Sequence, residues 1–222
     1  TIHADIQKQV EEVLAATRTK YKAKSAMAII MDPNNGRIVA MASVPRMNAN
    51  NRATLDVTAS QVRAITDPYE PGSVFKVVTV AGALEEGLTT PSTMYTVPAK
   101  FPFEFEGRTR YITDAHKRES AEDMTTTDIL QRSSNVGTIL ISQRLQKRDK
   151  LRYWMDRFGF GQKTGIDLNN ESDGDLPKTP WDDGRRYNIP FGQGLTATML
   201  QQTRAYAAIA NGGLLVTPHV VA

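Results

Sequence analysis

Hydrophobic residues recur at helical spacing near the start of the chain and then give way to two short apolar runs. The spacing predicts a helix from Asp5 to about Thr17, with Asp5 as its N-cap and an apolar face made of Ile6, Val10, Val13 and Leu14. Residues 26–31 and 37–43 are apolar, and residues 32–36 between them are turn formers. This pattern predicts an antiparallel hairpin, with both strands buried enough to lose the alternation of apolar and polar positions.

Beyond the hairpin the pattern is mainly that of helices separated by polar or glycine-rich segments. Helices are predicted over about residues 73–86, 123–131, 136–146, 149–158 and 198–210. Gly87 closes the first of these, and Thr198 with Gln201 form a capping box at the start of the last. Loops with small strands are expected over 88–118, a long loop over 159–188, and a strand over 214–221.

Composition restricts the chemistry that this chain can carry. The 222 residues have a net charge of +3 and no cysteine, which excludes disulfides, thiolate nucleophiles and cysteine zinc sites. The charge is too mild to predict nucleic-acid binding. The local basic runs at 20–24 and 144–152 are interpreted as solvated faces, with anionic lipid or cell-wall polymer as the less favoured alternative. The histidines share no short metal-binding motif, so neither a metal nor another cofactor is predicted.

The most informative stretch is Tyr69-Glu70-Pro71-Gly72-Ser73-Val74-Phe75-Lys76, which leads into an apolar helix. Ser73 falls in the first helical turn, where the partial positive charge of the helix N-terminus favours a developing oxyanion. Lys76 follows three residues later on the same face and can accept the serine proton if burial keeps it neutral. The alternative is an ordinary helix start, because serine is a preferred cap and lysine a common helix former.

A second polar cluster, Ser133-Ser134-Asn135, lies at the junction between two predicted helices. The string is also a good helix boundary, so a purely structural interpretation is open. In a catalytic interpretation the Ser133 hydroxyl relays a proton between Lys76 and a leaving group, and the Asn135 amide holds Lys76 or a substrate carbonyl.

Several longer strings occur together in a fixed order. They are Thr1 to Gln7, Asp32 to Gly36, Ile38 to Pro45, the two polar clusters, Phe158 to Leu168, Phe191 to Leu195, and Ala205 to Gly213. With this order and spacing the chain resembles, over nearly its whole length, the transpeptidase domain of class B penicillin-binding proteins, the monofunctional D,D-transpeptidases. These share a serine acyl-transferase superfamily with the β-lactamases.

The resemblance implies an α/β (α+β) fold, the penicillin-binding/β-lactamase-like fold in which helices flank an antiparallel sheet. It implies that Ser73 attacks D-Ala-D-Ala stem peptides, that an amine then resolves the acyl-enzyme into a cross-link, and that β-lactams acylate Ser73. Lys76 is then the general base, Ser133 the relay and Asn135 the orienting group, with Gly72 and Ser134 beside the substrate. Implied partners are stem peptides, β-lactams and cell-wall synthesis or division proteins. The implied location is the extracytoplasmic face of a bacterial membrane, held by an N-terminal anchor outside this chain.

The family's third motif, Lys-Thr/Ser-Gly on an edge strand, has two apparent matches here, and we accept neither. Lys163-Thr164-Gly165 lies among glycines and is followed by an acidic loop, and Lys178-Thr179-Pro180 ends in a proline that cannot supply a strand N–H. Residues 1–222 are therefore interpreted as a partial transpeptidase domain whose third motif and C-terminal strands lie beyond Ala222. We expect the fragment to be inactive and poorly stable by itself, unless a second chain completes its sheet.

Other interpretations of the chain are open at this point. A calcium loop at 169–180 is disfavoured, because its first position is Asn169 and its twelfth is Pro180. His116 is more simply a surface group than a site residue. The alternative functions are a serine β-lactamase, a β-lactam sensor and a non-catalytic division scaffold. A β-lactamase would turn penicillin over rapidly, a sensor would be acylated without cross-linking peptides, and a scaffold would not be acylated.

Overall fold

The computed structural model describes residues 2–47, 50–51, 61–147 and 150–221. Two units are each built from more than one stretch of chain. The first unit comprises residues 1–69, 158–174 and 197–222, and the second comprises residues 70–157 and 175–196. All four candidate catalytic residues therefore belong to the second unit.

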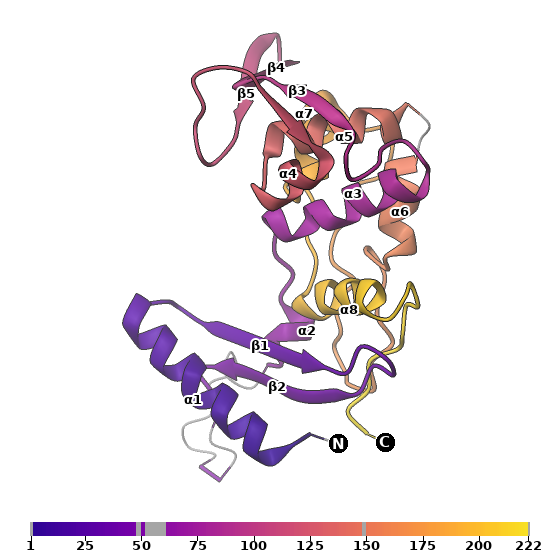
Figure 1. Cartoon of the computed structure of the whole chain (residues 1–222). Coiled ribbons are helices and arrows are strands. Elements are labelled where there is room, and N and C mark those ends of the chain that lie inside the picture. Colours follow the sequence, from indigo (N-terminus) through magenta and orange to yellow (C-terminus); the bar gives the residue numbers. More distant parts are fainter. Residues whose placement is uncertain (1, 48–49, 52–60, 148–149, 222) are drawn as a thin grey trace. The chain divides into compact units, whose positions relative to one another are not determined.

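The first unit is organised around the predicted hairpin. β1 (Ala26–Met31) pairs antiparallel with β2 (Ile38–Val44), Ala26 lying opposite Val44, and the register shifts between Ile30 and Met31. Helix α1 (Ala4–Tyr21) packs on the hairpin through Leu14, which contacts Ala42 and Val44 (Figure 1). The short helix α2 (Arg63–Thr66) and helix α8 (Met199–Ala210) complete this unit.

Three expectations for the first unit are wrong in detail. The N-cap of α1 is His3, and Asp5 lies inside the first turn. The burial of β2 alternates along the strand, because one of its faces packs on the core and the other is only partly covered. Residues 214–221 form no strand, and a parallel bridge between Arg37 and His219 joins them to the residue just before β2. The side chain of Asp167 holds this segment instead, accepting from the N–H groups of Val220 and Val221.

The predicted capping box of α8 is confirmed. Thr198 accepts from the N–H of Gln201, and the Gln201 side chain accepts from the N–H of Thr198. The amide nitrogen of Gln201 also donates to the carbonyls of Gln162 and Asp173, so the buried residue connects the helix start to two loops. A capping box can be predicted from the sequence because its two residues are only three positions apart.

The second unit contains a group of helices around α3 (Lys76–Glu85) (Figure 1). The others are α4 (Thr126–Gln131), α5 (Asn135–Gln146), α6 (Lys150–Arg157) and α7 (Asp183–Asn188), with the 3-10 helices η2 (Gly72–Phe75) and η3 (Ile189–Phe191). Helices approach closely at two glycines. A Cβ on Gly82 would lie 2.7 Å from the Trp154 ring, and one on Gly137 would lie 2.6 Å from Ile129.

Two small antiparallel sheets accompany these helices. β3 (Met94–Val97) pairs with β6 (Glu122–Thr125), and β4 (Lys100–Phe105) pairs with β5 (Arg108–Thr113). Phe101 and Phe103 of β4 pack on the Tyr187 ring of α7, with ring centroids 5.0 and 5.5 Å apart. The strands that the sequence predicts near 95–97 and 110–112 are present. Most of β6 lies in a segment predicted to be a helix, and α7 in one predicted to be a loop, and both predictions are wrong.

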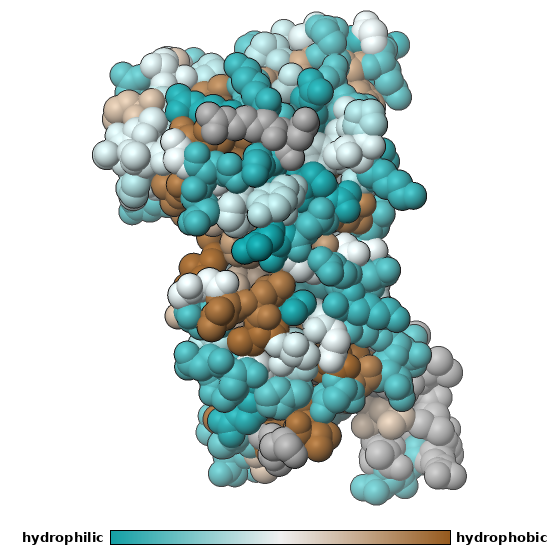
Figure 2. Space-filling model, turned by 90° about the vertical axis from the view of Figure 1, so that its right-hand side faces the viewer, coloured by the Kyte–Doolittle hydropathy of each residue, from teal (hydrophilic) through white to brown (hydrophobic). Residues whose placement is uncertain are grey.

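Hydrophilic side chains cover most of the face shown in Figure 2, and hydrophobic ones gather there in separate patches. Among the helices in the described part of the chain, none combines the length and the apolar character needed to cross a membrane.

Candidate active site

Ser73 lies in η2, at the entrance to α3, and is exposed. The buried ring of Phe75 anchors the same short helix, and Lys76 begins α3 directly after it. Because three residues make one turn, the Ser73 and Lys76 side chains meet, and Nζ of Lys76 lies 2.9 Å from Oγ of Ser73. The predicted serine–lysine pair is therefore in direct contact.

The Lys76 side chain is almost completely buried, with 1% of its surface exposed. Besides Ser73, its Nζ donates to the carbonyl oxygen of Ser133 at 2.7 Å and to the Ser133 hydroxyl at 2.8 Å. The structure thus brings together Ser73 and Ser133 through one amine, although they are sixty positions apart in the sequence.

Burial of Lys76 changes its acid–base chemistry. Loss of hydration disfavours the ammonium and lowers the pKa of Lys76 from 10.5 to about 8, while the nearby Asp114 carboxylate opposes this effect. At neutral pH a useful minority of the amine is deprotonated, roughly a tenth at one pH unit below the pKa. An amine in this state can accept a proton from a hydroxyl.

Ser133 occupies a tight turn between α4 and α5 and has a φ of 55°, in the left-handed region that few non-glycine residues adopt. Its N–H donates to the carbonyl of Leu130, and the N–H of Ser134 donates to that of Ile129. The end of α4 therefore holds the turn in the conformation that aims both oxygens of Ser133 at Lys76.

Ser134 caps α5, with its hydroxyl accepting from the N–H of Gly137. The same hydroxyl donates to the carboxylate of Asp114, at 2.9 and 3.1 Å to its two oxygens, and the residue is 1% exposed. The expectation that Ser134 contacts substrate does not fit this burial, because its hydroxyl is used inside the protein. Its side chain fixes the start of α5.

Asp114 is the functional-site residue that the sequence analysis missed. It is buried, accepts from the N–H of Val136 at 3.0 Å as well as from Ser134, and pairs with Arg118 at 3.0 Å. Arg118 in turn donates to the carbonyls of Val97 and Pro98. No motif in the sequence marks Asp114, because its importance comes from contacts with residues about twenty positions away.

Asn135 is the first residue of α5, and its side-chain amide donates to the carbonyl of Thr113 at 3.0 Å. This bond uses one of its two N–H donors and ties the start of α5 to the end of β5. Of the two predicted roles of the Asn135 amide, contact with Lys76 is not formed here, and contact with a substrate carbonyl stays a prediction.

Gly72, expected beside the substrate, has a φ of 60° and donates its N–H to the carbonyl of Gly192 at 2.9 Å. A Cβ on Gly192 would lie 2.1 Å from the Gly72 carbonyl oxygen, so only glycine fits at 192. Nearby, the N–H of Gly194 donates to the Glu70 carboxylate at 2.8 Å. The 192–194 loop thus supports the backbone that carries Ser73.

Other candidates from the sequence lie elsewhere. Lys163-Thr164-Gly165 belongs to the first unit and forms no strand. The Glu171 carboxylate accepts from the N–H and hydroxyl of Thr164 and from the N–H of Gly165. This use of Glu171 also argues against the calcium loop, and the described residues contain no cluster suited to a metal ion. His116 is exposed.

The sequence is similar to a family model and to proteins of known function. Residues 26–222 match the family model for the penicillin binding protein transpeptidase domain. Penicillin-binding protein PbpB of Mycolicibacterium smegmatis is 34% identical over 226 residues, covering 100% of this chain and 34% of PbpB. Peptidoglycan D,D-transpeptidase FtsI of Escherichia coli is 35% identical over 196 residues, covering 87% of this chain and 32% of FtsI.

Solved structures agree with the sequence relatives. Penicillin binding protein 3 of Mycobacterium tuberculosis, complexed with aztreonam, has a TM-score of 0.88 at 33% identity, covering 100% of this chain and 48% of that protein. The chain thus spans about a third of the length of these curated relatives, 34% and 32%, and about half of this solved structure. The predicted α/β fold of the superfamily is confirmed, and the chain belongs to the penicillin-binding protein transpeptidase domain family.

Proposed function

We propose that this chain carries the nucleophile, base and proton relay of a peptidoglycan D,D-transpeptidase. The observation that supports the proposal most directly is the position of the Lys76 amine, 2.9 Å from the Ser73 hydroxyl and 2.8 Å from the Ser133 hydroxyl. Relatives named D,D-transpeptidases, and a neighbour whose structure contains aztreonam, support the same reaction class.

Neutral Lys76 has two N–H donors and one lone pair. The Ser133 carbonyl can only accept, so it takes one N–H, and the Ser133 hydroxyl takes the other. The lone pair then faces the Ser73 hydroxyl, whose proton can pass directly to Nζ. The two contacts to Ser133 orient Lys76 as the base for Ser73.

The proposed reaction has two acyl transfers. Oγ of Ser73 attacks the carbonyl carbon of the penultimate D-alanine while its proton moves to Lys76. The tetrahedral intermediate then expels the terminal D-alanine, whose amine takes a proton by way of the Ser133 hydroxyl. An amine from a neighbouring stem peptide next attacks the ester, forms the cross-link and returns a proton to Oγ of Ser73.

Charge on the carbonyl oxygen needs N–H donors. Ser73 is near the start of η2, where backbone N–H groups lack partners within the helix, so its own N–H suits one side of an oxyanion hole. The second donor belongs to the Lys-Thr/Ser-Gly strand in this family, and we propose that residues other than 163–165 and 178–180 supply it.

The same reaction class defines the surroundings of the protein. The proposed ligands are stem peptides and β-lactams, the proposed partners are other cell-wall proteins, and the proposed location is the extracytoplasmic face of the membrane.

The test is intact-mass measurement of the complete polypeptide that carries these residues, after exposure to a penicillin. A stable adduct equal to the mass of one penicillin is expected, and Ser73→Ala should abolish it. Ser92→Ala, another exposed serine of the same unit, is the matched control and should retain the adduct. Absence of any adduct would favour a scaffold, and rapid loss of the adduct would favour a β-lactamase.

A second assay separates a transpeptidase from a sensor. The same protein is incubated with a D-Ala-D-Ala pentapeptide donor and an amine acceptor, and both the released D-alanine and the cross-linked product are quantified. A transpeptidase forms both products in a manner that depends on Ser73. Acylation by penicillin without either product would contradict the proposal and favour a β-lactam sensor.

A further inference from the structure

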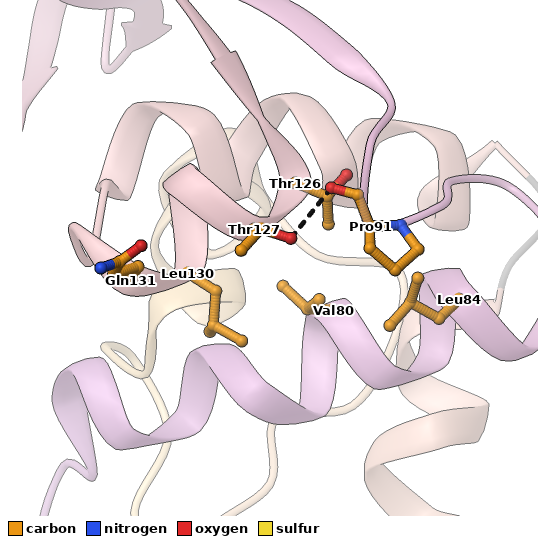
Figure 3. Close-up of a pocket in the computed structure, with 7 residues that line it drawn as sticks. All are labelled: Val80, Leu84, Pro91, Thr126, Thr127, Leu130 and Gln131. Atoms are coloured by element: carbon orange, nitrogen blue, oxygen red, sulfur yellow. Dashed lines mark hydrogen bonds between the residues drawn. The ribbon is translucent and has the colours of Figure 1, made fainter.

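A pocket with a volume of about 410 Å³ lies between α3 and α4. It is lined by Val80, Leu84, Pro91, Thr126, Thr127, Leu130 and Gln131. In Figure 3 Val80 and Leu84 rise from α3; Pro91 lies above Leu84 at one end, and Leu130 and Gln131 of α4 lie at the other. Leu84 and Leu130 are 38% and 39% exposed, and Pro91, Thr127 and Gln131 are exposed as well, so the lining is open to solvent on several sides.

The side chains that line this pocket favour an uncharged, mostly apolar ligand. None of the seven side chains is charged. The hydroxyl of Thr127 donates to the Pro91 carbonyl at 3.0 Å, and that of Thr126 lies 2.7 Å from the Thr89 hydroxyl, so both are used within the protein. The wall therefore offers mostly carbon, and the Gln131 carboxamide supplies a polar group at one end. A volume near 400 Å³ suits a small molecule.

The position of the pocket connects it to the site. Residues 76, 80 and 84 are spaced by four, so Lys76, Val80 and Leu84 lie along one face of α3. On the opposite wall, Leu130 lines the pocket and its carbonyl accepts the N–H of Ser133. The two helices that border the pocket are thus the ones that position the amine and the relay hydroxyl.

We propose that this pocket binds a compact, neutral, mostly apolar molecule of one or two fused rings, with a hydrogen-bonding group directed at Gln131. A bound ring moves Leu84 and Leu130 apart and changes the separation of α3 from the turn at Ser133. The Lys76 contacts to Ser133 then lengthen, and acylation of Ser73 slows. This second part rests on the proposed function, whereas binding in the pocket does not.

Indole is a suitable probe, because it is bicyclic and neutral and carries one N–H donor. The complete polypeptide is labelled with ¹³C in leucine and valine methyl groups and titrated with indole. Saturable shifts are expected for Leu84, Leu130 and Val80. In parallel, the rate of acylation by a fluorescent penicillin is expected to fall about tenfold at saturating indole, the size of effect expected when one ordinary hydrogen bond is lost.

Paired variants test the location of binding. Leu84→Trp fills the pocket and is expected to abolish the indole-dependent shifts, whereas Glu85→Trp, on the neighbouring exposed position, is expected to retain them. Gln131→Ala keeps the apolar wall and is expected to weaken indole binding several-fold, which provides a test if Leu84→Trp fails to fold.

Three results would overturn the inference. The first is the absence of saturable shifts at the lining methyl groups, and the second is equal binding to the wild type and Leu84→Trp. The third is saturation by indole without any change in the acylation rate, which would refute the coupling to Lys76. A response of these methyl groups to a protein partner but not to indole would also refute the small-molecule occupant. Failure of the proposed function is distinct, because Ser73 would then not be acylated even without indole.

Discussion

Lys76 contacts Ser133 twice, through a 2.7 Å hydrogen bond to the carbonyl oxygen and a 2.8 Å hydrogen bond to the hydroxyl. The first contact depends on the backbone of a turn with a positive φ, and the second on a side chain that substitution can remove. These contacts have different functions in the proposed mechanism. Both contacts orient the amine, and the hydroxyl in addition transfers the proton.

Ser133→Ala should separate these two functions. The variant keeps the carbonyl and the turn, so Lys76 retains one of its two orienting contacts, but the relay hydroxyl is lost. We expect acylation by penicillin to fall about a hundredfold, the lower end of what a positioned acid–base group contributes. Stopped-flow measurement of acylation tests this, with Ser92→Ala as the control. An unchanged rate would show that the leaving group receives its proton by another route.

Acylation should also depend on pH through Lys76. The base must be neutral to accept the Ser73 proton, and burial lowers the pKa of Lys76 to about 8. The rate constant is therefore expected to rise tenfold per pH unit below pH 8 and to level off above it. Acylation measured from pH 5.5 to 9.5 tests this dependence. A rate that falls as the pH increases through 8 would mean that the protonated amine is the active form.

Asp114→Asn is expected to affect both the stability of the second unit and the pH profile. The buried carboxylate pairs with Arg118 and accepts from Ser134 and Val136, so its loss leaves Arg118 without its ionic partner and should cost on the order of 3 kcal/mol. Because Asp114 raises the pKa of Lys76, its removal should lower that pKa further. The rise in acylation rate is then expected at lower pH than in the wild type.

Denaturant unfolding and the pH profile of acylation measure these two effects separately. Asp123→Asn is the matched control, because Asp123 is an exposed carboxylate of the same unit that accepts from the Thr96 hydroxyl. It should leave the pH profile unchanged. If Asp114→Asn lowers the free energy of unfolding but leaves the pH dependence of acylation unchanged, Asp114 has a structural role only.

The elements that the sequence predicted well are those with local signals. The hairpin around 32–36, the helix ending at Gly87 and the capping box at Thr198 each depend on residues close together in the chain. The predictions failed where contacts distant in sequence decide the structure. Residues 214–221 have a strand pattern, yet Asp167 holds their backbone instead of a sheet, and β6 is a strand because β3 pairs with it.

The candidate site divides in the same way. Ser73 and Lys76 can be paired from their spacing alone, because one helical turn brings them together. The contact of Lys76 with Ser133 is only one of two interpretations of the Ser133-Ser134-Asn135 string, and the family resemblance favours it, since sixty positions separate Ser133 from Ser73. Asp114 and Gly192 carry no local signal, because the first acts through a buried network and the second through close approach to Gly72.

The close approach of Gly192 to Gly72 leads to the last prediction. Gly192→Ala would place a methyl group 2.1 Å from the Gly72 carbonyl oxygen, one residue before the nucleophile, at a backbone with a φ of 87°. The 69–73 backbone must then move, and we expect acylation of Ser73 to fall by at least about tenfold, as expected when reacting groups are displaced by an ångström or less.

Gly212→Ala separates this contact from backbone strain. Gly212 has nearly the same φ, 84°, but a Cβ there meets nothing within 4 Å. Its substitution should cost only the strain of a left-handed backbone, about 1 kcal/mol, and leave acylation unchanged. Comparison of the two variants by thermal unfolding and by penicillin acylation measures the difference. Equal acylation rates in the two would mean that Ser73 does not depend on the 192–194 loop for its position, since backbone strain is common to both substitutions.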